Sequence, residues 1–346
     1  MSVKDFVFVL KQGKSMGRLI SLHFQDNTDT QMTPLMKAIK SIHSVSASGE
    51  SFYLDDIKKQ RASQDLLGGI AKPSMNVVTE EFTIREIPCE WVKPEYKHEK
   101  DRVILYCHGG GYTCGSLKYA RVLASRVAEY TGMEVLSFEY RLAPEHPHPA
   151  AIEDALVIWN YLMQLGYGAR EVILLGDSAG GNLALELALK IKSQNRLLPK
   201  GIILMSPWTD MTMTGESYET CKDIDPILSY EYIRTARYSY CGLNDEYNDD
   251  DKEKDYTMED QDFDFSDPKF SPLFADFEGF PPVLIQVGSN EVLKDDSYRL
   301  YEKLLKEGVF AALEEYEGAW HVFQMHPVKK SAKALESVSD FIDRLF

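Results

Sequence analysis

The hydrophobic pattern of the chain changes near residue 76. In residues 1–75, apolar positions such as Phe6, Leu10, Leu35 and Ile39 recur at spacings that favour one face of a helix, with polar residues between the runs. From residue 77 the pattern becomes alternating and then a series of short aliphatic runs. Alternation of period two is typical of strands, so residues 77–84 and 87–92 are predicted to be antiparallel strands at one end of a sheet.

The remainder of the chain alternates between strand-like and helix-like segments. Strands are predicted at 103–107, 134–140, 172–175, 201–206, 283–287 and 311–316, and helices at 119–130, 150–165, 183–189, 295–307 and 329–346. Strands that alternate with helices indicate a mainly parallel sheet covered by helices on both faces. We therefore expect one catalytic α/β domain over residues 76–346, with residues 1–75 either as a simple helical extension or as a lid over a pocket.

Residues 209–280 interrupt this alternation, and an insertion over 209–265 is expected. Within it, residues 243–267 hold twelve Asp or Glu and two Lys, a local balance of −10 in a chain of net charge −16. The composition predicts a solvated loop. The spacing from Asp251 to Asp262 matches an EF-hand, but the sixth position, which requires glycine, is Tyr256. No metal site is predicted.

Charge and composition argue against several classes of binding partner and several cellular locations. The acidic balance argues against nucleic acid and anionic membranes, and no apolar run reaches the ~18 residues of a membrane span. The five cysteines are an odd number without a C-x-x-C spacing, which favours free thiols in a reducing compartment. We expect a cytoplasmic protein without stable membrane insertion, and a homodimer stays open.

The strongest chemical signal is Gly176-Asp177-Ser178-Ala179-Gly180. It joins the strand-like run 172–175 to the helical run 183–189, and a serine between two glycines at such a junction is a nucleophile elbow. The sharp turn exposes the serine hydroxyl, and the following N–H lies at a helix N-terminus, where negative charge is favoured. Ser178 is therefore the predicted nucleophile.

A nucleophilic serine needs a base, and the base must come later in the chain on this type of elbow. His321 and His326 are the two histidines that follow Ser178. His321 comes directly after a predicted strand, on a short loop, whereas His326 lies near a helix start. His321 is the predicted base.

The acid that orients the base is expected on the loop after strand 283–287. Its candidates are Asn290, Glu291, Asp295 and Asp296. An asparagine cannot stabilise the imidazolium, and the two aspartates fit the first turn of the next helix, where they meet the helix dipole. Glu291 is the predicted acid.

The run His108-Gly109-Gly110-Gly111 follows a predicted strand. Three glycines allow backbone N–H groups to approach one point without side-chain obstruction, which suits an oxyanion. The predicted donors are the N–H groups of Gly109, Gly110 and Ala179, and His108 is expected to fix the loop rather than transfer protons.

Together these motifs resemble the hormone-sensitive-lipase-like family of carboxylesterases, over about residues 77–346. The resemblance is carried by His108–Gly111, Tyr140–Glu145 with His146-Pro147, Gly176–Asn182 and Glu291–Asp296. The family usually has Asp where this chain has Glu291. The resemblance implies an α/β-hydrolase fold, no cofactor, short acyl esters as substrates, and a cap built from N-terminal helices and a later insertion, for which residues 1–75 and part of 209–265 are suited.

The sequence thus predicts a serine carboxylesterase that hydrolyses short-chain, acetyl-like esters through an acyl-serine. Tyr112 and Trp208 are candidate walls of its substrate pocket, although both types of residue are as common in a protein core. Two alternatives remain: an amidase or deacetylase with the same triad, and a non-catalytic small-ligand receptor on this fold.

Overall fold

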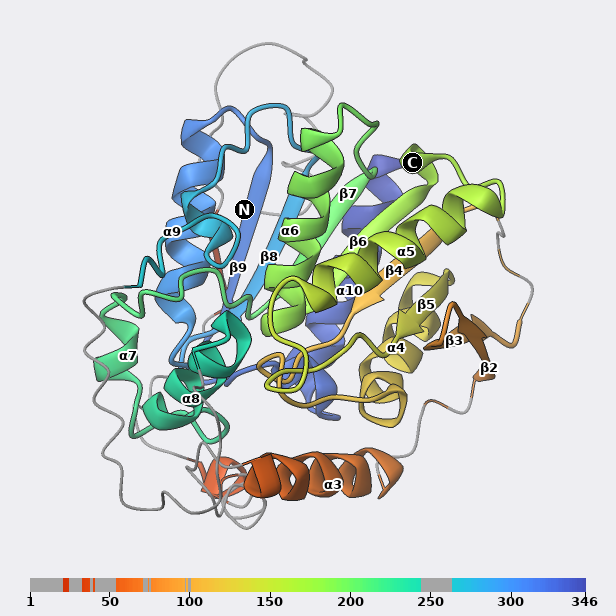
Figure 1. Ribbon diagram of the computed structural model, residues 1–346. Coiled ribbons are helices and arrows are strands. Elements are labelled where there is room, and N and C mark those ends of the chain that lie inside the picture. Colours follow the sequence, from red (N-terminus) through yellow and green to blue (C-terminus); the bar gives the residue numbers. More distant parts are fainter. Residues whose placement is uncertain are drawn as a thin grey trace.

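The computed structural model describes residues 21–24, 33–37, 40, 54–70, 74, 76–96, 98, 101–243 and 263–346. Most of the acidic segment predicted to be a solvated loop (residues 244–262) and most of the N-terminal segment predicted to be helical (residues 1–53) lie outside the described residues. The described residues form an α/β structure around one nine-stranded sheet, in the order β1-β9-β8-β7-β6-β4-β5-β3-β2 (Figure 1).

The sheet is mainly parallel, as predicted. Its strands are β1 (Ser21–Phe24), β2 (Val77–Ile84), β3 (Ile87–Pro94), β4 (Val103–Cys107), β5 (Glu134–Phe138), β6 (Val172–Asp177), β7 (Gly201–Met205), β8 (Val283–Gly288) and β9 (Ala311–Tyr316). Antiparallel pairing is confined to β2 with β3 and β3 with β5, at the edge where the sequence predicted it. The central strands β4, β6, β7 and β8 are buried along their whole length, which explains their uninterrupted aliphatic runs.

Strand β1 corrects one sequence prediction. Residues 1–75 were expected to be helical, but Ser21–Phe24 pairs in parallel with β9 and extends the sheet at its other edge. Four residues carry too little periodicity to distinguish a strand from a helix turn. The free edge of β9, distant in sequence, supplies the hydrogen bonds that decide the conformation.

Helices cover both faces of the sheet. They are α3 (Leu54–Ile70), α4 (Leu117–Thr131), α5 (Ala150–Gln164), α6 (Ala179–Ser193), α7 (Ser217–Thr220), α8 (Tyr230–Cys241), α9 (Lys294–Lys306) and α10 (Lys329–Leu345). Alternate residues of the central strands pack against α4 and α10 on one face and against α5, α6 and α9 on the other (Figure 1). The sheet therefore separates two apolar layers, as in the predicted architecture.

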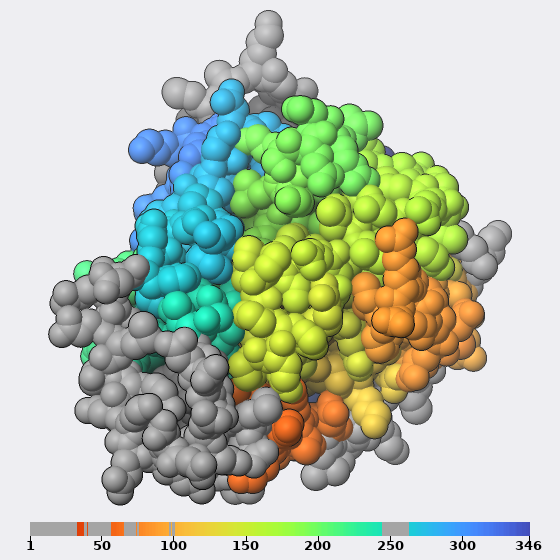
Figure 2. Space-filling view, viewed as in Figure 1, coloured from red at the N-terminus to blue at the C-terminus, as the bar shows by residue number. Residues whose placement is uncertain are grey.

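Helix α3 lies across one end of this body, where it packs against α4 (Figure 1). Figure 2 shows α3, in orange-red, directly against the yellow-green segment that follows β5. Arg61 makes the contact: its guanidinium donates to the carbonyls of Thr113 and Ala143 at 2.7 and 2.8 Å and forms an ion pair with Glu145. One arginine thus fixes an N-terminal helix to two loops of the α/β body.

Candidate active site

Ser178 occupies the turn between β6 and α6. Its φ of +53° and ψ of −123° are strained for a residue with a side chain, and it is 8% exposed. The flanking glycines make the turn feasible, because a Cβ on Gly180 would lie 2.0 Å from the carbonyl oxygen of Cys107, and one on Gly176 would lie 2.1 Å from that of Gly180. The sequence thus folds into the predicted elbow for steric reasons.

His321 and Glu291 meet beside the elbow. The distance from His321 Nδ1 to Glu291 Oε1 is 3.9 Å, with both side chains buried. This is longer than a hydrogen bond, and within the described part of the chain neither atom has a hydrogen-bond partner. Catalytic hydrogen bonds are often long before substrate binds, so the two atoms face each other in a competent arrangement.

The other oxygen of Glu291 is firmly held. Oε2 accepts hydrogen bonds from Ser206 Oγ at 2.8 Å and from the N–H of Gly288 at 3.1 Å. Ser206 Oγ in turn accepts from the N–H of Val322, the residue after His321. The carboxylate is therefore oriented by the ends of β7 and β8, with Oε1 left for the imidazole.

The glycine loop requires a correction. Gly109 was a predicted oxyanion donor, but its N–H donates to Asp177 Oδ1 at 2.9 Å and is not available. The N–H groups of Gly110, Gly111 and Ala179 donate no hydrogen bond among the described residues. Gly110 and Gly111 also line the cavity that contains Ser178, whereas Gly109 does not. Gly111, with a φ of +62°, thus has an unused N–H at this cavity, whereas Gly109 does not.

Asp177 explains this shift, and sequence reasoning assigned it no role. Its carboxylate is fully buried and accepts from Tyr106 Oη at 2.6 Å as well as from Gly109. Burial raises the pKa of Asp177 to about 6, and the two hydrogen bonds oppose that rise. The sequence did contain a signal for this role, because Asp177 directly precedes Ser178. A carboxylate at that position can accept only from N–H groups close to the elbow, such as that of Gly109.

His108 fixes the loop, as expected for a residue that transfers no proton. Its Nδ1 lies 2.8 Å from the carbonyl of Gly109, and its ring stacks on Tyr140 at 4.2 Å. Burial lowers the pKa of His108 to about 4. The ring is therefore neutral at neutral pH and is enclosed by the protein.

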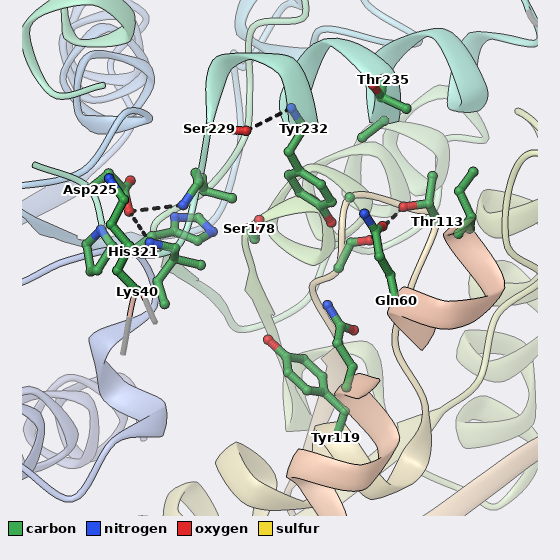
Figure 3. Close-up of a pocket in the computed structure, with 18 of the residues that line it drawn as sticks. Lys40, Gln60, Thr113, Tyr119, Ser178, Asp225, Ser229, Tyr232, Thr235 and His321 are labelled. Atoms are coloured by element: carbon green, nitrogen blue, oxygen red, sulfur yellow. Dashed lines mark hydrogen bonds between the residues drawn. The ribbon is translucent and has the colours of Figure 1, made fainter. Parts of the chain in front are cut away.

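Ser178 and His321 open into one cavity of about 260 Å³ (Figure 3). Its walls come from α3, the glycine loop, α4, the segment 222–229 and α8, together with Lys40. Ile57, Gln60 and Gln64 line it from α3, at spacings that place them on one helix face. Figure 3 shows Ser178 between His321 on one side and Gln60 and Tyr119 on the other.

Tyr112 and Trp208, the predicted pocket walls, do not line this cavity. Tyr112 is 1% exposed, stacks on Tyr240 at 3.6 Å and donates its hydroxyl to Asn182 Oδ1. Trp208 is 2% exposed, and its carbonyl accepts from Asn182 Nδ2. Both are core residues that belong to the same apolar cluster as α6. Tyr119 and Tyr232 are the tyrosines that line the cavity, and neither was singled out from the sequence.

Metal ligands, cysteines and apolar helices were the remaining features considered in the sequence. Within the described part of the chain, no group of three or more His, Cys, Asp or Glu side chains is placed to bind a metal ion. The five cysteines are free thiols, as predicted. Among the described helices, none combines the length and apolar character needed to cross a membrane.

The comparisons with known proteins agree with this geometry. Residues 104–325 match a family model described as α/β hydrolase fold. The chain is 37% identical to an esterase of Acinetobacter venetianus over 246 residues, which is 70% of this chain and 75% of that protein. It is 33% identical to an acetyl-hydrolase of Streptomyces hygroscopicus, covering 81% of this chain and 86% of the relative.

Solved structures give the same result. The crystal structure of an esterase from the bacterial hormone-sensitive lipase family superposes with a TM-score of 0.79 at 30% identity, covering 91% of this chain and 99% of the other. A hormone-sensitive lipase from a metagenome library gives a TM-score of 0.78 at 28% identity, covering 92% and 100%.

Proposed function

Because the chain belongs to the hormone-sensitive-lipase-like carboxylesterases of the α/β-hydrolase fold family, we propose that it hydrolyses short-chain acyl esters through an acyl-serine on Ser178. The observation that carries this proposal is the position of Ser178. It sits on a strained turn and in one cavity with His321, Gly110 and Gly111, and the N–H groups of these glycines and of Ala179 donate no hydrogen bond among the described residues.

In the first half-reaction, Ser178 Oγ attacks the ester carbonyl carbon while its proton passes to Nε2 of His321. Nδ1 is the nitrogen that faces Glu291, which leaves Nε2 for the serine. Glu291 stabilises the imidazolium that forms. The C–O bond to the alcohol then breaks, and the departing oxygen takes the proton from His321.

The negative charge that develops on the carbonyl oxygen needs hydrogen-bond donors. The N–H groups of Gly110, Gly111 and Ala179 supply them, and Ala179 adds the positive end of the α6 dipole. Loss of a single donor of this kind costs about 100- to 1,000-fold in turnover. In the second half-reaction, water gives a proton to His321 and attacks the acyl carbon, and the acid is released as Ser178 regains its proton.

The proposal for short acyl groups rests on the size of the cavity. Its volume of about 260 Å³ is below the ~300–1,000 Å³ typical of sites that enclose drug-sized ligands. We propose that α3, the segment 222–229 and α8 form the cap that sets this limit, because all three contribute to the lining together with Ser178.

A panel of p-nitrophenyl esters from acetate to decanoate tests the proposal. We expect the highest kcat/KM among the shortest chains and a decline of about tenfold or more by decanoate, because longer chains exceed the cavity. A rate that rises with chain length contradicts the short-acyl assignment. The same panel with p-nitroacetanilide separates the esterase from an amidase, since an amidase cleaves the anilide at a rate comparable to the matched ester.

A further inference from the structure

A second buried carboxylate, that of Asp225, lies at the catalytic centre. Asp225 is 1% exposed and lines the same cavity as Ser178 and His321. Figure 3 shows it beside His321, on the segment that leads into α8. None of the reaction steps described above uses it.

One oxygen of Asp225 shapes the cavity wall. Oδ1 accepts from the N–H of Ile227 at 2.8 Å and from that of Leu228 at 3.1 Å. Both residues line the cavity next to Asp225. The carboxylate therefore sets the backbone of the wall that approaches His321.

The other oxygen reaches the loop that carries the proposed acid. Oδ2 accepts from the N–H of Val292 at 2.9 Å, and Val292 directly follows Glu291. With three N–H groups bound, Asp225 joins its own segment to a residue 67 positions later in the chain. A charge-assisted hydrogen bond of this kind is stronger than one between neutral groups.

Asp225 also interacts electrostatically with both His321 and Glu291. Burial raises its pKa to about 6, while His321 and the N–H groups of Ile227 and Val292 oppose the rise and Glu291 adds to it. The negative charge of Asp225 is thus placed where an imidazolium at His321 forms.

The identity of the acid makes such a contact necessary. A glutamate has one more rotatable bond than an aspartate, so Glu291 needs a fixed backbone to keep Oε1 directed at His321. The gap of 3.9 Å between Oε1 and Nδ1 closes to a hydrogen bond only if the loop stays in place. Displacements of about 1 Å at such a site cost about 100-fold in rate.

We propose that Asp225 is a positioning residue that joins the cavity wall to the Glu291 loop and so aligns Glu291 with His321. The inference rests on the proposed function of Ser178, His321 and Glu291. It assigns to the segment between β7 and α8 a direct part in the geometry of the triad, in addition to enclosing the substrate.

Asp225→Asn tests the proposal, because it keeps the size of the side chain but cannot accept on both sides. Asp295→Asn is the matched control: Asp295 Oδ2 accepts from the N–H of Ser217 at 2.9 Å, so it joins the start of α9 to α7, and Asp295 does not line the cavity. Steady-state kinetics with p-nitrophenyl acetate and thermal melts are measured for both variants.

For Asp225→Asn we expect kcat to fall by about 10- to 100-fold with KM within about twofold. For Asp295→Asn we expect kcat and KM to stay within about twofold of the wild type, even if its melting temperature falls as far as that of Asp225→Asn. Asp225→Ser is a second variant in case Asp225→Asn does not fold. Its hydroxyl can still accept from the N–H groups of Ile227 and Leu228 but does not reach Val292, so the same fall in kcat is expected.

A spectroscopic measurement follows the alignment itself. In the enzyme inhibited by an organophosphate, the Nδ1–H proton of His321 should give a low-field NMR signal that Asp225→Asn shifts or removes and Asp295→Asn retains. The proposal is overturned if Asp225→Asn keeps wild-type kcat, or if activity in both variants simply follows their stability. Full activity of Ser178→Ala would instead contradict the proposed function.

Discussion

Glu291 divides its two oxygens between structure and the proposed chemistry. Oε2 is bound by Ser206 and Gly288, whereas Oε1 faces His321. In Asp296, five residues later, Oδ2 accepts hydrogen bonds from the N–H groups of Thr209 and Asp210. Among the described residues the other oxygen of Asp296 has no hydrogen-bond partner either, so at the residue scale the proposed acid is distinguished by a free oxygen that faces His321.

Replacement of Glu291 by glutamine should therefore lower kcat strongly. We expect a loss between about 100- and 10,000-fold, because the amide does not stabilise the imidazolium. The melting temperature should change little, since Gln retains an oxygen for Ser206. Asp296→Asn should instead lower the melting temperature more than kcat. A silent Glu291→Gln together with an inactive but folded Asp296→Asn would relocate the acid.

His108 gives a prediction about stability and pH. Folding lowers its pKa from 6.5 to about 4 through burial, so the unfolded chain binds more protons between these values. Its contribution to stability is fully present above pH 6.5 and is lost as the pH falls toward 4. From pH 8 to pH 5 this loss amounts to about 2 kcal/mol.

The comparison of wild type with His108→Gln isolates this contribution, because other buried groups such as Asp177 titrate in both proteins. Urea unfolding at pH 8 and pH 5 should show that the stability advantage of the wild type shrinks by about 2 kcal/mol on acidification. An advantage that stays constant or grows would mean that His108 is not held neutral by burial.

Residue-level prediction from sequence relied on chain order and local pattern. Ser178, Glu291 and His321 were selected on those grounds, and the structure brings them to one place. It failed where the outcome depends on a distant partner. Asp177 takes the N–H of Gly109, and no property of three consecutive glycines indicates which N–H is consumed.

At the scale of elements, the junction of β6 and α6 depends on close backbone contact. A Cβ on Gly180 would meet the carbonyl oxygens of Cys107 at 2.0 Å and of His108 at 2.5 Å. Backbone at the end of β4 cannot move aside as a side chain does. The second glycine of the elbow is therefore required by packing between α6 and β4.

Gly180→Ala should destabilise the protein by more than about 3 kcal/mol, since overpacking costs about 1–3 kcal/mol even where neighbours can adjust. Gly168→Ala is the control. Its added Cβ meets nothing closer than 3.6 Å, and the backbone has an ordinary φ of −74°, so the change should stay below about 1 kcal/mol. Equal stability of the two variants in urea titrations would contradict the packing argument.

The docking of α3 is the second element-scale feature. Arg61 makes its contacts with two loops, and Asp65 accepts a further hydrogen bond from Ser116 Oγ. Removal of the Arg61 contacts to Thr113, Ala143 and Glu145 should free the helix that lines the cavity. Arg61→Met is expected to raise KM for p-nitrophenyl butanoate by about tenfold with a smaller change in kcat. Lys58→Met removes an exposed cation from the same helix and should be neutral. An unchanged KM in Arg61→Met would separate α3 from substrate binding.

The elements themselves were largely predictable, for a physical reason. Buried parallel strands such as β4 and β6 carry aliphatic runs, and helices such as α10 keep an apolar face. Strand β1 was mistaken for part of a helix because pairing with β9 decides its conformation. Local periodicity does not report which edge of a sheet remains free.

At the scale of the whole molecule, the sheet brings distant segments to one edge. The glycine loop follows β4, Ser178 follows β6, the Glu291 loop follows β8, and His321 follows β9. Parallel strands end at the same edge, so one topology assembles the site from four loops. Helix α3 from the N-terminal part and α8 from the insertion then close over it (Figures 1 and 3). The sequence predicted the sheet, but it did not indicate which side chains would face the cavity, and the assignment of residues 1–75 and 209–265 to a cap stays a prediction.

The central claim is that Ser178 is the nucleophile of this ester hydrolase. Incubation with diethyl p-nitrophenyl phosphate, which phosphorylates an activated serine with release of p-nitrophenolate, tests it by peptide mapping in the mass spectrometer. The account predicts a single diethylphosphoryl group per chain, located on Ser178, with matching loss of esterase activity and no adduct in Ser178→Ala. An adduct on another residue, or a Ser178→Ala variant that is labelled and hydrolyses esters like the wild type, would contradict it.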